Sequence, residues 1–322
     1  MSDSNAPLPF QSVLIFGMGM MGASLAKALE LSESFQGRVT GAVRTEKSVR
    51  DLQELGIGDE VIRLTESATD DGWPAGLPDP SHFDLIVLGL PVRAAVQILP
   101  RLADFRGIIT DMSSTGAVAR HARGLPDMRF VGSHPMCGSE KKGPTAFVAD
   151  LFQGRLCMIM DVPPEGADAR IAERFATDRD RVEALWRAVG MQVFRVDPDR
   201  HDEIVAYLSH GPHLIAGLLT IWARDSETVV DSMERSPLRI SGGGFKSMAR
   251  IAGSNPEMWY DIVDTNRASI LDGMRRFANQ LEDLISLLEN GKGDEADREA
   301  WHAWLNRARD DRDFLVGGEG EQ

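Results

Sequence analysis

The feature that most constrains the fold of this chain is a glycine-rich segment, Gly-Met-Gly-Met-Met-Gly, at residues 17–22. It follows an apolar run at residues 13–16 and precedes a helix-forming run at residues 23–31. In this context the first glycine allows a tight turn, the second lets a pyrophosphate approach the backbone, and the third lets helix and strand pack closely. The N-terminus of the following helix supplies free N–H groups for the phosphates. The segment therefore predicts a dinucleotide-binding domain.

Short apolar or β-branched runs alternate with helix-like stretches through the first half of the chain. These runs lie at residues 13–16, 39–43, 85–90, 108–110, 130–131 and 156–160. Such alternation indicates βαβ units and a mainly parallel sheet. Residues 69–81 hold three prolines and two glycines, which favours a surface loop rather than a domain boundary. With a helix expected at 179–189 and a last strand at 192–196, we predict an α/β fold with a Rossmann-type domain over residues 10–198.

The end of the second predicted strand bears on the choice of cofactor. Arg44 follows Val43 there, where an NAD site usually places an acidic residue, and an arginine can instead neutralise a 2′-phosphate. Thr45 and Ser48 add hydrogen-bond donors. The alternative is that Arg44 is an ordinary exposed arginine, so NADP is favoured and NAD remains possible. The expected cofactor contacts are Gly17, Gly19, Met20, Met21, Gly22, Arg44, Thr45, Ser48, Leu90 and Pro91.

Beyond residue 198 the pattern turns helical. An apolar seam with alternating spacings of four and three residues runs through Ile270, Met274, Phe277, Leu281, Leu284 and Leu288. Such a seam needs a partner surface, which either the same chain or a second copy across a two-fold axis can supply. We expect an all-helical substrate and dimerisation domain at 199–316, and a flexible tail at 317–322. Ser209, His210, Pro212 and His213 interrupt the apolar run at 204–223, so we expect a buried helix there rather than a membrane span.

Composition excludes some functions and narrows the location. The 322 residues include 49 acidic and 35 basic side chains, a net charge of −14, which disfavours a sequence-independent grip on nucleic acid or on an anionic membrane. Cys137 and Cys157 lack the spacing of a metal site, and no signal peptide precedes the first strand. His210 and His213 are three residues apart but have no accompanying ligands, so no metal is expected. These observations predict a cytoplasmic protein.

A candidate catalytic segment, Gly-Ser-His-Pro-Met-Cys-Gly-Ser-Glu, lies at residues 132–140, directly after the strand predicted at 130–131. Because open α/β sheets bind ligands at the carboxyl ends of their strands, His134 is expected over the cofactor crevice, where its imidazole can act as a base. The alternative is a structural histidine that caps a turn. Two further polar clusters follow, at residues 201–213 and at residues 242–250, where three glycines and Phe245 precede Lys246 and Arg250.

Taken together, residues 17–22, 111–114, 132–140, 201–213 and 242–259 resemble the prephenate and arogenate dehydrogenase family over most of the chain. The resemblance implies oxidative decarboxylation of prephenate or arogenate with hydride transfer to NAD(P)+, giving 4-hydroxyphenylpyruvate or tyrosine. It also implies a homodimer in which the helical domains of two subunits interlock. No separate regulatory domain follows the helical part, so feedback by tyrosine through such a domain is not expected.

The resemblance assigns roles to particular residues. His134 is the catalytic group at the ring hydroxyl of the small-molecule substrate, and Ser114 assists it. His213 and Arg250 belong to the substrate pocket with Lys246, and His210 supports them; the guanidinium fork suits a carboxylate. The chain departs from the family pattern at residues 113 and 116, which are serine and glycine instead of glycine and lysine, and at residues 247–249. These departures leave the choice between the keto and the amino substrate open.

Two other functions remain alternatives. A 3-hydroxy acid dehydrogenase with the same two-domain plan depends on a lysine in its helical half, and Lys246 is available for that role. A non-catalytic nucleotide-sensing protein would keep the cofactor fold without the chemistry. The joint presence of His134, Ser114 and Arg250 argues against it.

Overall fold

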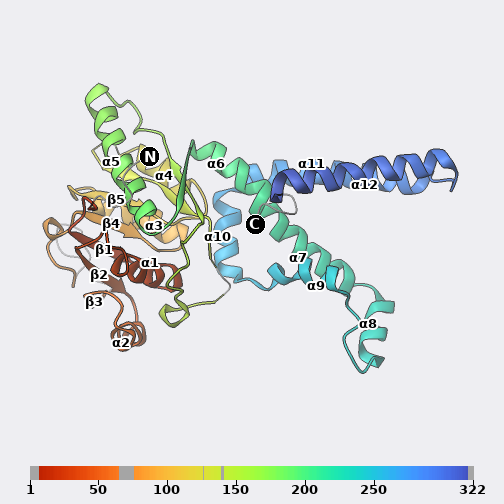
Figure 1. Cartoon of the computed structure of the whole chain (residues 1–322), viewed down its shortest axis with the longest axis horizontal. Coiled ribbons are helices and arrows are strands. Elements are labelled where there is room, and N and C mark those ends of the chain that lie inside the picture. The colour runs from red at the N-terminus through yellow and green to blue at the C-terminus, as the bar shows by residue number, and fades with distance from the viewer. Residues whose placement is uncertain (1–6, 65–75, 126, 139–140, 318–322) are drawn as a thin grey trace. The chain divides into compact units, whose positions relative to one another are not determined.

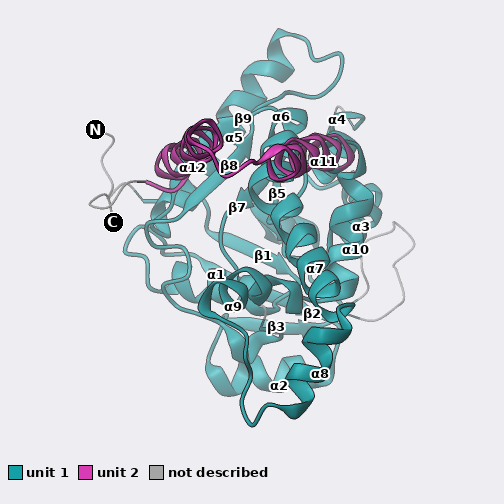
Figure 2. Cartoon of the chain, turned by 90° about the vertical axis from the view of Figure 1, so that its right-hand side faces the viewer, with its two compact units in different colours: residues 1–270 teal, residues 271–322 magenta. Residues whose placement is uncertain are grey.

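The computed structural model describes residues 7–64, 76–125, 127–138 and 141–317. The chain forms two compact units, Met1–Ile270 and Leu271–Gln322 (Figure 2). The predicted domain division after residue 198 falls inside the first unit and stays a prediction. Most of the loop predicted at 69–81, the last two residues of the segment 132–140, and residues 318–322 of the predicted tail lie outside the described residues.

The first unit is built on a parallel six-stranded sheet of order β3-β2-β1-β4-β5-β6 (Figure 1). Its strands are β1 Ser12–Phe16, β2 Arg38–Val43, β3 Glu60–Arg63, β4 Leu85–Leu88, β5 Ile108–Asp111 and β6 Phe130–Val131. This order confirms the predicted Rossmann-type fold. It places the topological switch point between β1 and β4, where doubly wound sheets bind ligands at the carboxyl ends of the strands.

Helices cover both faces of this sheet because successive strand residues point to opposite sides. Along β1, Val13 and Ile15 join a hydrophobic core on one face, and Leu14 and Phe16 join the core on the other. The first core includes residues of α1 Met20–Glu30, α2 Glu46–Leu55 and α5 Ala169–Ala188. The second includes residues of α3 Val92–Ile98 and α4 Ala117–Arg123. Burial on both faces explains why β4 reads as a continuous apolar run.

A second, three-stranded sheet consists of β7 Ser133–Pro135, β8 Leu156–Met160 and β9 Gln192–Val196. β8 pairs antiparallel with β7 and parallel with β9. The strands expected at 156–160 and 192–196 are therefore present, but they form a sheet of their own with β7, which was not predicted. His134 consequently lies within a strand, opposite Met158, and not in a loop after β6.

The rest of the first unit is helical. Its elements are α6 Pro198–Val205, the π-helical turn η4 Ala206–His210, α7 Gly211–Arg224, α8 Glu227–Arg235, α9 Gly243–Ala249, the 3-10 turn η5 Arg250–Gly253 and α10 Pro256–Thr265. The stretch Pro198–Arg224 is long and apolar enough to span a membrane by length and composition, with 28% of its most apolar window buried. Its buried polar residues are hydrogen-bonded within the unit, as described below, so this weak signal does not indicate a membrane protein.

The predicted apolar seam is confirmed as helical, because all of it lies in α11 Arg267–Asn290. This helix begins at the end of the first unit and continues in the second, which also contains α12 Glu295–Val316. Trp301 and Trp304 of α12 meet edge to face, with ring centroids 6.1 Å apart. Leu288 of the seam is 62% exposed in the single chain.

Candidate active site

The glycine-rich turn between β1 and α1 has the shape that a pyrophosphate needs. Gly17 has φ +87°, and a Cβ atom there would lie 2.4 Å from the carbonyl oxygen of Gly89. A Cβ atom on Gly22 would lie 2.3 Å from the carbonyl oxygen of Gly17, so neither position accepts a larger residue. A Cβ atom on Gly19, by contrast, would meet nothing within 4 Å. The turn is closed on the protein side and open where a ligand would approach.

The N-terminus of α1 is left free for such a ligand. Gly19 is the N-cap residue and makes no side-chain capping hydrogen bond, and the first turn, which begins with Met20 and Met21, holds no acidic residue. The helix dipole and the uncapped N–H groups therefore favour an anion. Leu90 lies against the turn, 2.9 Å from a Cβ atom built on Gly17, and Pro91 is the N-cap residue of α3. These residues fit a bound dinucleotide phosphate.

The residues after β2 lie where an adenosine ribose would be expected. Arg44 is exposed, while the Thr45 side chain caps α2 by accepting a hydrogen bond from the Ser48 N–H at 3.1 Å. The two hydroxyl oxygens of Thr45 and Ser48 are also 2.8 Å apart. Arg63 lies opposite Val43 in the strand pairing and forms an exposed ion pair with Glu46 at 3.5 Å. Sequence reasoning missed Arg63 because the short, charged strand β3 was not predicted.

His134 belongs to a chain of buried polar groups. Its Nδ1 atom lies 2.8 Å from Nε2 of His201, and Nδ1 of His201 lies 2.9 Å from Oδ1 of Asp202. Asp202 Oδ1 also accepts a hydrogen bond from the Gly116 N–H at 2.7 Å, and Oδ2 pairs with Arg120 at 2.7 Å. Within the described part of the chain, Nε2 of His134 makes no hydrogen bond. One ring nitrogen of His134 is therefore held by the protein, and the other is available to a substrate.

Burial controls the charge of this cluster. It lowers the pKa of His134 well below the ordinary value, and the neighbouring rings of His201 and His210 lower it further. Burial raises the pKa of Asp202, but hydrogen bonds from His201 and Gly116 and the charge of Arg120 outweigh this effect and bring that pKa below its ordinary value. His134 is therefore neutral at neutral pH, as a proton acceptor must be.

The π-helical turn explains how His210 reaches the cluster. The Gly211 N–H donates to the carbonyl of Ala206 five residues earlier, and a Cβ atom on Gly211 would lie 2.7 Å from that oxygen. π-bulges of this kind are common at functional sites. Nδ1 of His210 lies 3.1 Å from Nδ2 of Asn266, which also donates to the carbonyl of Asp202 at 2.8 Å. Burial lowers the pKa of His210 to about 4, so this side chain is neutral as well.

Two further predicted site residues, His213 and Ser114, lie next to His210. His213 stacks on Trp259, with ring centroids 3.4 Å apart and planes inclined by 12°, and Trp259 also meets the ring of His210 edge to face at 6.0 Å. The backbone of half-buried Ser114 lies close enough to His210 to raise its pKa. The structure thus connects His134, His210, His213 and Ser114 through a few contacts.

Arg250 and Lys246 are not connected to that cluster. Lys246 lies in α9 and Arg250 begins η5, and both side chains are exposed. Neither forms a hydrogen bond or an ion pair within the described residues. Their predicted contact with a substrate therefore depends on a ligand or a second chain, and it stays a prediction.

Asp111 at the end of β5 was not predicted to have a role of its own, but in the structure it supports β7. Its Oδ1 atom accepts a hydrogen bond from the N–H of Ser133 at 2.8 Å, and Thr110 and Ser133 share a hydrogen bond of 2.7 Å. Burial raises the pKa of Asp111 to about 7, although hydrogen bonds from Ser133 and Ser113 oppose the shift. These contacts hold the strand that carries His134 against the large sheet.

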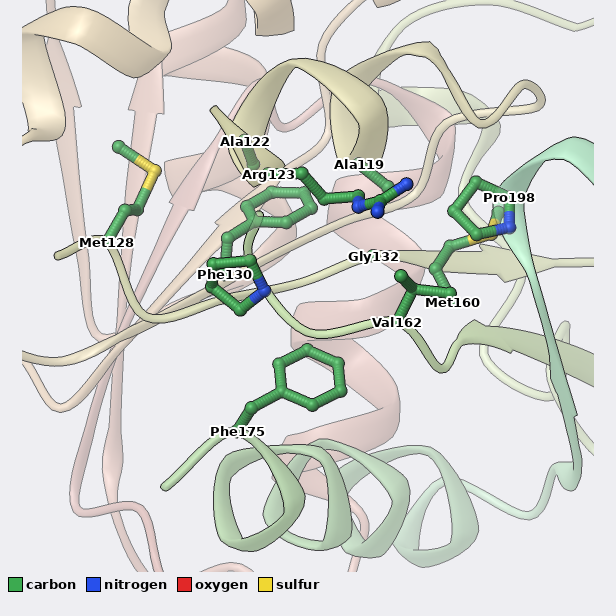
Figure 3. Close-up of a pocket in the computed structure, with 11 residues that line it drawn as sticks. Ala119, Ala122, Arg123, Met128, Phe130, Gly132, Met160, Val162, Phe175 and Pro198 are labelled. Atoms are coloured by element: carbon green, nitrogen blue, oxygen red, sulfur yellow. The ribbon is translucent and has the colours of Figure 1, made fainter. Parts of the chain in front are cut away.

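Two hollows in the described part of the chain lie outside the cluster around His134. The one in Figure 3 is lined mostly by apolar side chains such as Phe130, Met160 and Phe175, and its volume of about 10 Å³ is close to that of a single water. A larger hollow of about 420 Å³ is lined by Phe10, Asp84 and Ile108, which precede or begin the strands β1, β4 and β5. It therefore lies at the amino ends of the strands, opposite the edge where doubly wound sheets bind ligands.

A Rossmann-type sheet with an open phosphate turn, a neutral buried histidine and a following set of helices defines a nicotinamide-dependent dehydrogenase. Residues 25–171 match the family model "Prephenate dehydrogenase, nucleotide-binding domain", and residues 197–305 match "Prephenate dehydrogenase, dimerization domain". The chain belongs to the prephenate dehydrogenase family. It is accordingly an NAD(P)-dependent oxidoreductase, which confirms the predicted family and enzyme class. The two alternative functions are not favoured.

Individual relatives agree with this assignment. The chain is 26% identical to the prephenate dehydrogenase of Bacillus subtilis over 311 residues, covering 94% of this chain and 76% of the relative. It is 28% identical to the cyclohexadienyl dehydrogenase of Zymomonas mobilis over 297 residues, covering 88% and 91%. The crystal structure of Aquifex aeolicus prephenate dehydrogenase with hydroxyphenyl propionate and NAD+ superposes with a TM-score of 0.72 at 28% identity, covering 94% of this chain and 99% of that one.

Proposed function

We propose that this enzyme oxidatively decarboxylates prephenate or arogenate, with hydride transfer to a nicotinamide cofactor. The observation that carries the proposal is the geometry of His134, a neutral imidazole with one nitrogen held by His201 and the other free. The Bacillus subtilis and Aquifex aeolicus relatives are named prephenate dehydrogenases, which points to the first of these substrates. When bound, the nicotinamide supplies the hydride acceptor.

The reaction that follows is a concerted oxidation of the substrate ring. The free nitrogen of His134 takes the proton of the ring hydroxyl while hydride leaves the carbon that bears it. The bond to the ring carboxylate breaks, carbon dioxide departs, and the electron pair of that bond completes the aromatic ring. The resulting phenolate oxygen takes the proton back from His134, which leaves the imidazole neutral again. The products are 4-hydroxyphenylpyruvate from prephenate or tyrosine from arogenate. Because a protonated His134 cannot accept the hydroxyl proton, acid is expected to stop the reaction.

The other site residues are proposed to hold the substrate. Ser114 follows buried Ser113 and is placed beside His210, which supports its role at the same hydroxyl. His213, held flat against Trp259, is proposed to line the pocket. Arg250 and Lys246 are proposed to bind carboxylate, because both are cationic, exposed and without partners among the described residues.

For the cofactor we propose NADP in preference to NAD. No carboxylate follows β2 directly, and exposed Arg44 occupies that position. Glu46, the acid that could bind the ribose hydroxyls instead, is turned toward Arg63. Arg44 and Arg63 then present two guanidinium groups at the same end of the neighbouring strands, which suits a 2′-phosphate.

We propose a homodimer built through the helices. The match to a dimerization domain supports it, and so do the large side chains that α7 exposes: Leu218 is 54%, Ile221 59% and Trp222 70% exposed. Apolar patches of this kind mark association surfaces. We also propose that the enzyme acts in the cytoplasm, because Cys137 and Cys157 are free thiols.

The test is a purified-enzyme assay that crosses prephenate and arogenate with NAD+ and NADP+ and follows reduction of the nicotinamide. We expect turnover of at least one substrate, faster with NADP+. The His134→Ala variant serves as the control for contaminating activity. Absence of reduction in all four combinations, with a folded dimeric protein, contradicts the proposal.

A further inference from the structure

We propose that Asp202 and His201 act as positioning residues that set the tautomer of His134, so that Nε2 of His134 is the proton acceptor. The inference rests on the proposed function for its consequence in catalysis, but the tautomer itself can be measured without any substrate. The three side chains form a continuous line: Asp202 Oδ1 to His201 Nδ1 at 2.9 Å, and His201 Nε2 to His134 Nδ1 at 2.8 Å.

The carboxylate of Asp202 determines which atom donates in each hydrogen bond of this line. Asp202 accepts from the Gly116 N–H and pairs with Arg120, so it is ionised and can only accept. Nδ1 of His201 must then carry a hydrogen. A neutral imidazole has one N–H, so Nε2 of His201 is a bare acceptor, and Nδ1 of His134 donates to it. The second nitrogen of His134, Nε2, is left with its lone pair.

The competing arrangement makes His201 a cation with both nitrogens protonated. It is disfavoured because Asp202 already has a cationic partner in Arg120, which also pairs with the exposed Asp199 at 3.3 Å, so a second cation at the fully buried His201 would gain little attraction in return for its desolvation. His201 is fully buried, and its ring nitrogens contact His134 and Asp202. In that arrangement His134 would carry its hydrogen on Nε2 and could not accept a proton from a substrate.

The line also stabilises the product of proton transfer. Once Nε2 of His134 has taken a proton, the ring is cationic, and its Nδ1–H is shared with His201, behind which lies the negative charge of Asp202. The logic is that of the Ser-His-Asp triad, with a second imidazole inserted between acid and base. The groups that anchor Asp202 are distant from it in sequence. Gly116 is the N-cap residue of α4, and Arg120 lies in the last turn of this helix and also donates to the carbonyl of Thr265 at 3.3 Å.

The first experiment measures the tautomer by ¹⁵N NMR of the imidazole rings in the full-length protein without ligands. We expect the His134 resonances of the parent to show hydrogen on Nδ1 and a bare Nε2. The Asp202→Asn variant is expected to shift His134 toward the opposite tautomer, because an amide can donate to His201. The His121→Gln variant, which removes an exposed histidine of α4, is the matched control and leaves the pattern unchanged. A hydrogen on Nε2 of His134 in the parent overturns the proposal.

The second experiment measures turnover and its pH dependence. We expect Asp202→Asn and His201→Gln each to lower kcat by about 10²-fold, less than the roughly 10⁴-fold loss when the acid contacts the base directly. The acid limb of kcat/KM is expected to move to lower pH, because the cationic form of His134 loses its support. A role in folding alone would lower the plateau without moving this limb.

A double-variant cycle separates positioning from a general structural effect. In the His134→Ala background, His201→Gln is expected to change kcat less than three-fold, because residues that act through one another are strongly non-additive. A full additional loss in that background overturns the proposal. If Asp202→Asn does not fold, His201→Gln carries both measurements. If the parent turns over no substrate, the proposed function fails, and the NMR experiment still decides the tautomer.

Discussion

The sheet region of the first unit and its helices α7 to α10 differ in how much of their apolar surface a single chain buries. All residues of β4 and β5 are buried, and the largest fully buried side chains, among them Trp186, Phe10 and Phe16, lie in or beside the two sheets. In α7 and α10 only Gly211, Ala216 and Ile262 are buried, and α8 and α9 bury none. The first region completes its own core, whereas the second has the surface of a region that a partner completes.

The predicted site residues show the same difference in burial. His134 and its hydrogen-bonded neighbours are buried, while Arg250 and Lys246 are exposed among the open helices. Substitutions in the sheet region or in the buried cluster around His134 should therefore act on the chemical step or on the folding of one chain. Substitutions at exposed positions of α7 to α10 and η5 should act on substrate binding and on dimer assembly.

His134→Ala should lower kcat by about two to four orders of magnitude, the range for loss of a general base, while cofactor affinity is retained. The measurement is steady-state kinetics together with titration of the cofactor. His121→Gln provides the control for replacing a histidine outside the cluster. A near-normal kcat in His134→Ala would show that the buried base is structural.

The pH dependence of stability should be controlled by two buried side chains, Asp111 at the end of β5 and His210 at the end of η4. The pKa of His210 is lowered to about 4, so its contribution is fully present above pH ~6.5 and is lost as pH falls through 4. The pKa of Asp111 is raised to about 7, so its contribution is present below its ordinary pKa of 3.8 and is lost as pH rises through 7. The shift of His210 corresponds to ~3 kcal/mol of stability between pH ~6.5 and ~4, and that of Asp111 to ~4 kcal/mol between pH ~4 and ~7, with opposite sign.

Single variants separate the two groups. Asp111→Asn should make stability rise more steeply between pH ~4 and ~7, and His210→Gln should make it rise less or fall, as measured by urea unfolding. Equal pH slopes in the parent and both variants would show that neither side chain is desolvated in solution.

Trp222→Asp should break the dimer, because this side chain is 70% exposed in the single chain and aromatic anchors dominate association. A loss of about 2 kcal/mol or more corresponds to at least a roughly thirty-fold weaker dimer. Light scattering should move from twice the chain mass toward 35.3 kDa on dilution. Leu31→Asp, at a 62% exposed position after α1 in the sheet region, should leave the dimer intact. A parent protein that is a fully active monomer at all concentrations would contradict the inference that a second chain covers α7 to α10.

Arg250→Gln should raise KM for the substrate about ten-fold or more, since a charge-assisted hydrogen bond contributes roughly 1.5–3 kcal/mol. Arg250→Lys should restore little, because lysine lacks the planar fork. Arg101→Gln, an exposed arginine of the sheet region, is the matched control. An unchanged KM would show that the guanidinium of Arg250 faces solvent in the assembled enzyme.

The smallest effect is expected at the cofactor. Arg44→Ala should reduce the NADP-over-NAD ratio of kcat/KM about ten-fold, the value of one charged contact. Arg38→Ala, at the amino end of the same strand, should leave the ratio unchanged. A parent that prefers NAD would refute the proposed cofactor choice, and an unaffected ratio in Arg44→Ala would refute the role of this residue.

Local patterns in the sequence were sufficient for the phosphate turn, for most strands of the large sheet and for the seam of α11. Glycine requirements, strand burial and helical period are properties of neighbouring residues, so they can be read without knowledge of distant contacts. β3 was missed because charged residues at both its ends, Glu60 and Arg63, hide a four-residue strand. β7 was missed because His134 and Pro135 do not follow a strand pattern, and only pairing with β8 makes them one.

The groups that face His134 could not be predicted from local patterns. His201 lies 67 residues further along the chain, and nothing in either segment specifies their contact. It arises because β7 pairs with β8, Asp111 anchors β7, and α6 begins just after β9, so that Asp202 is held against α4. The fold class and the family were therefore readable from the sequence, which also predicted His134 as the base. The packing of strands and helices that are far apart in sequence determined the hydrogen bonds that orient that base, because such bonds depend on distances which no local pattern encodes.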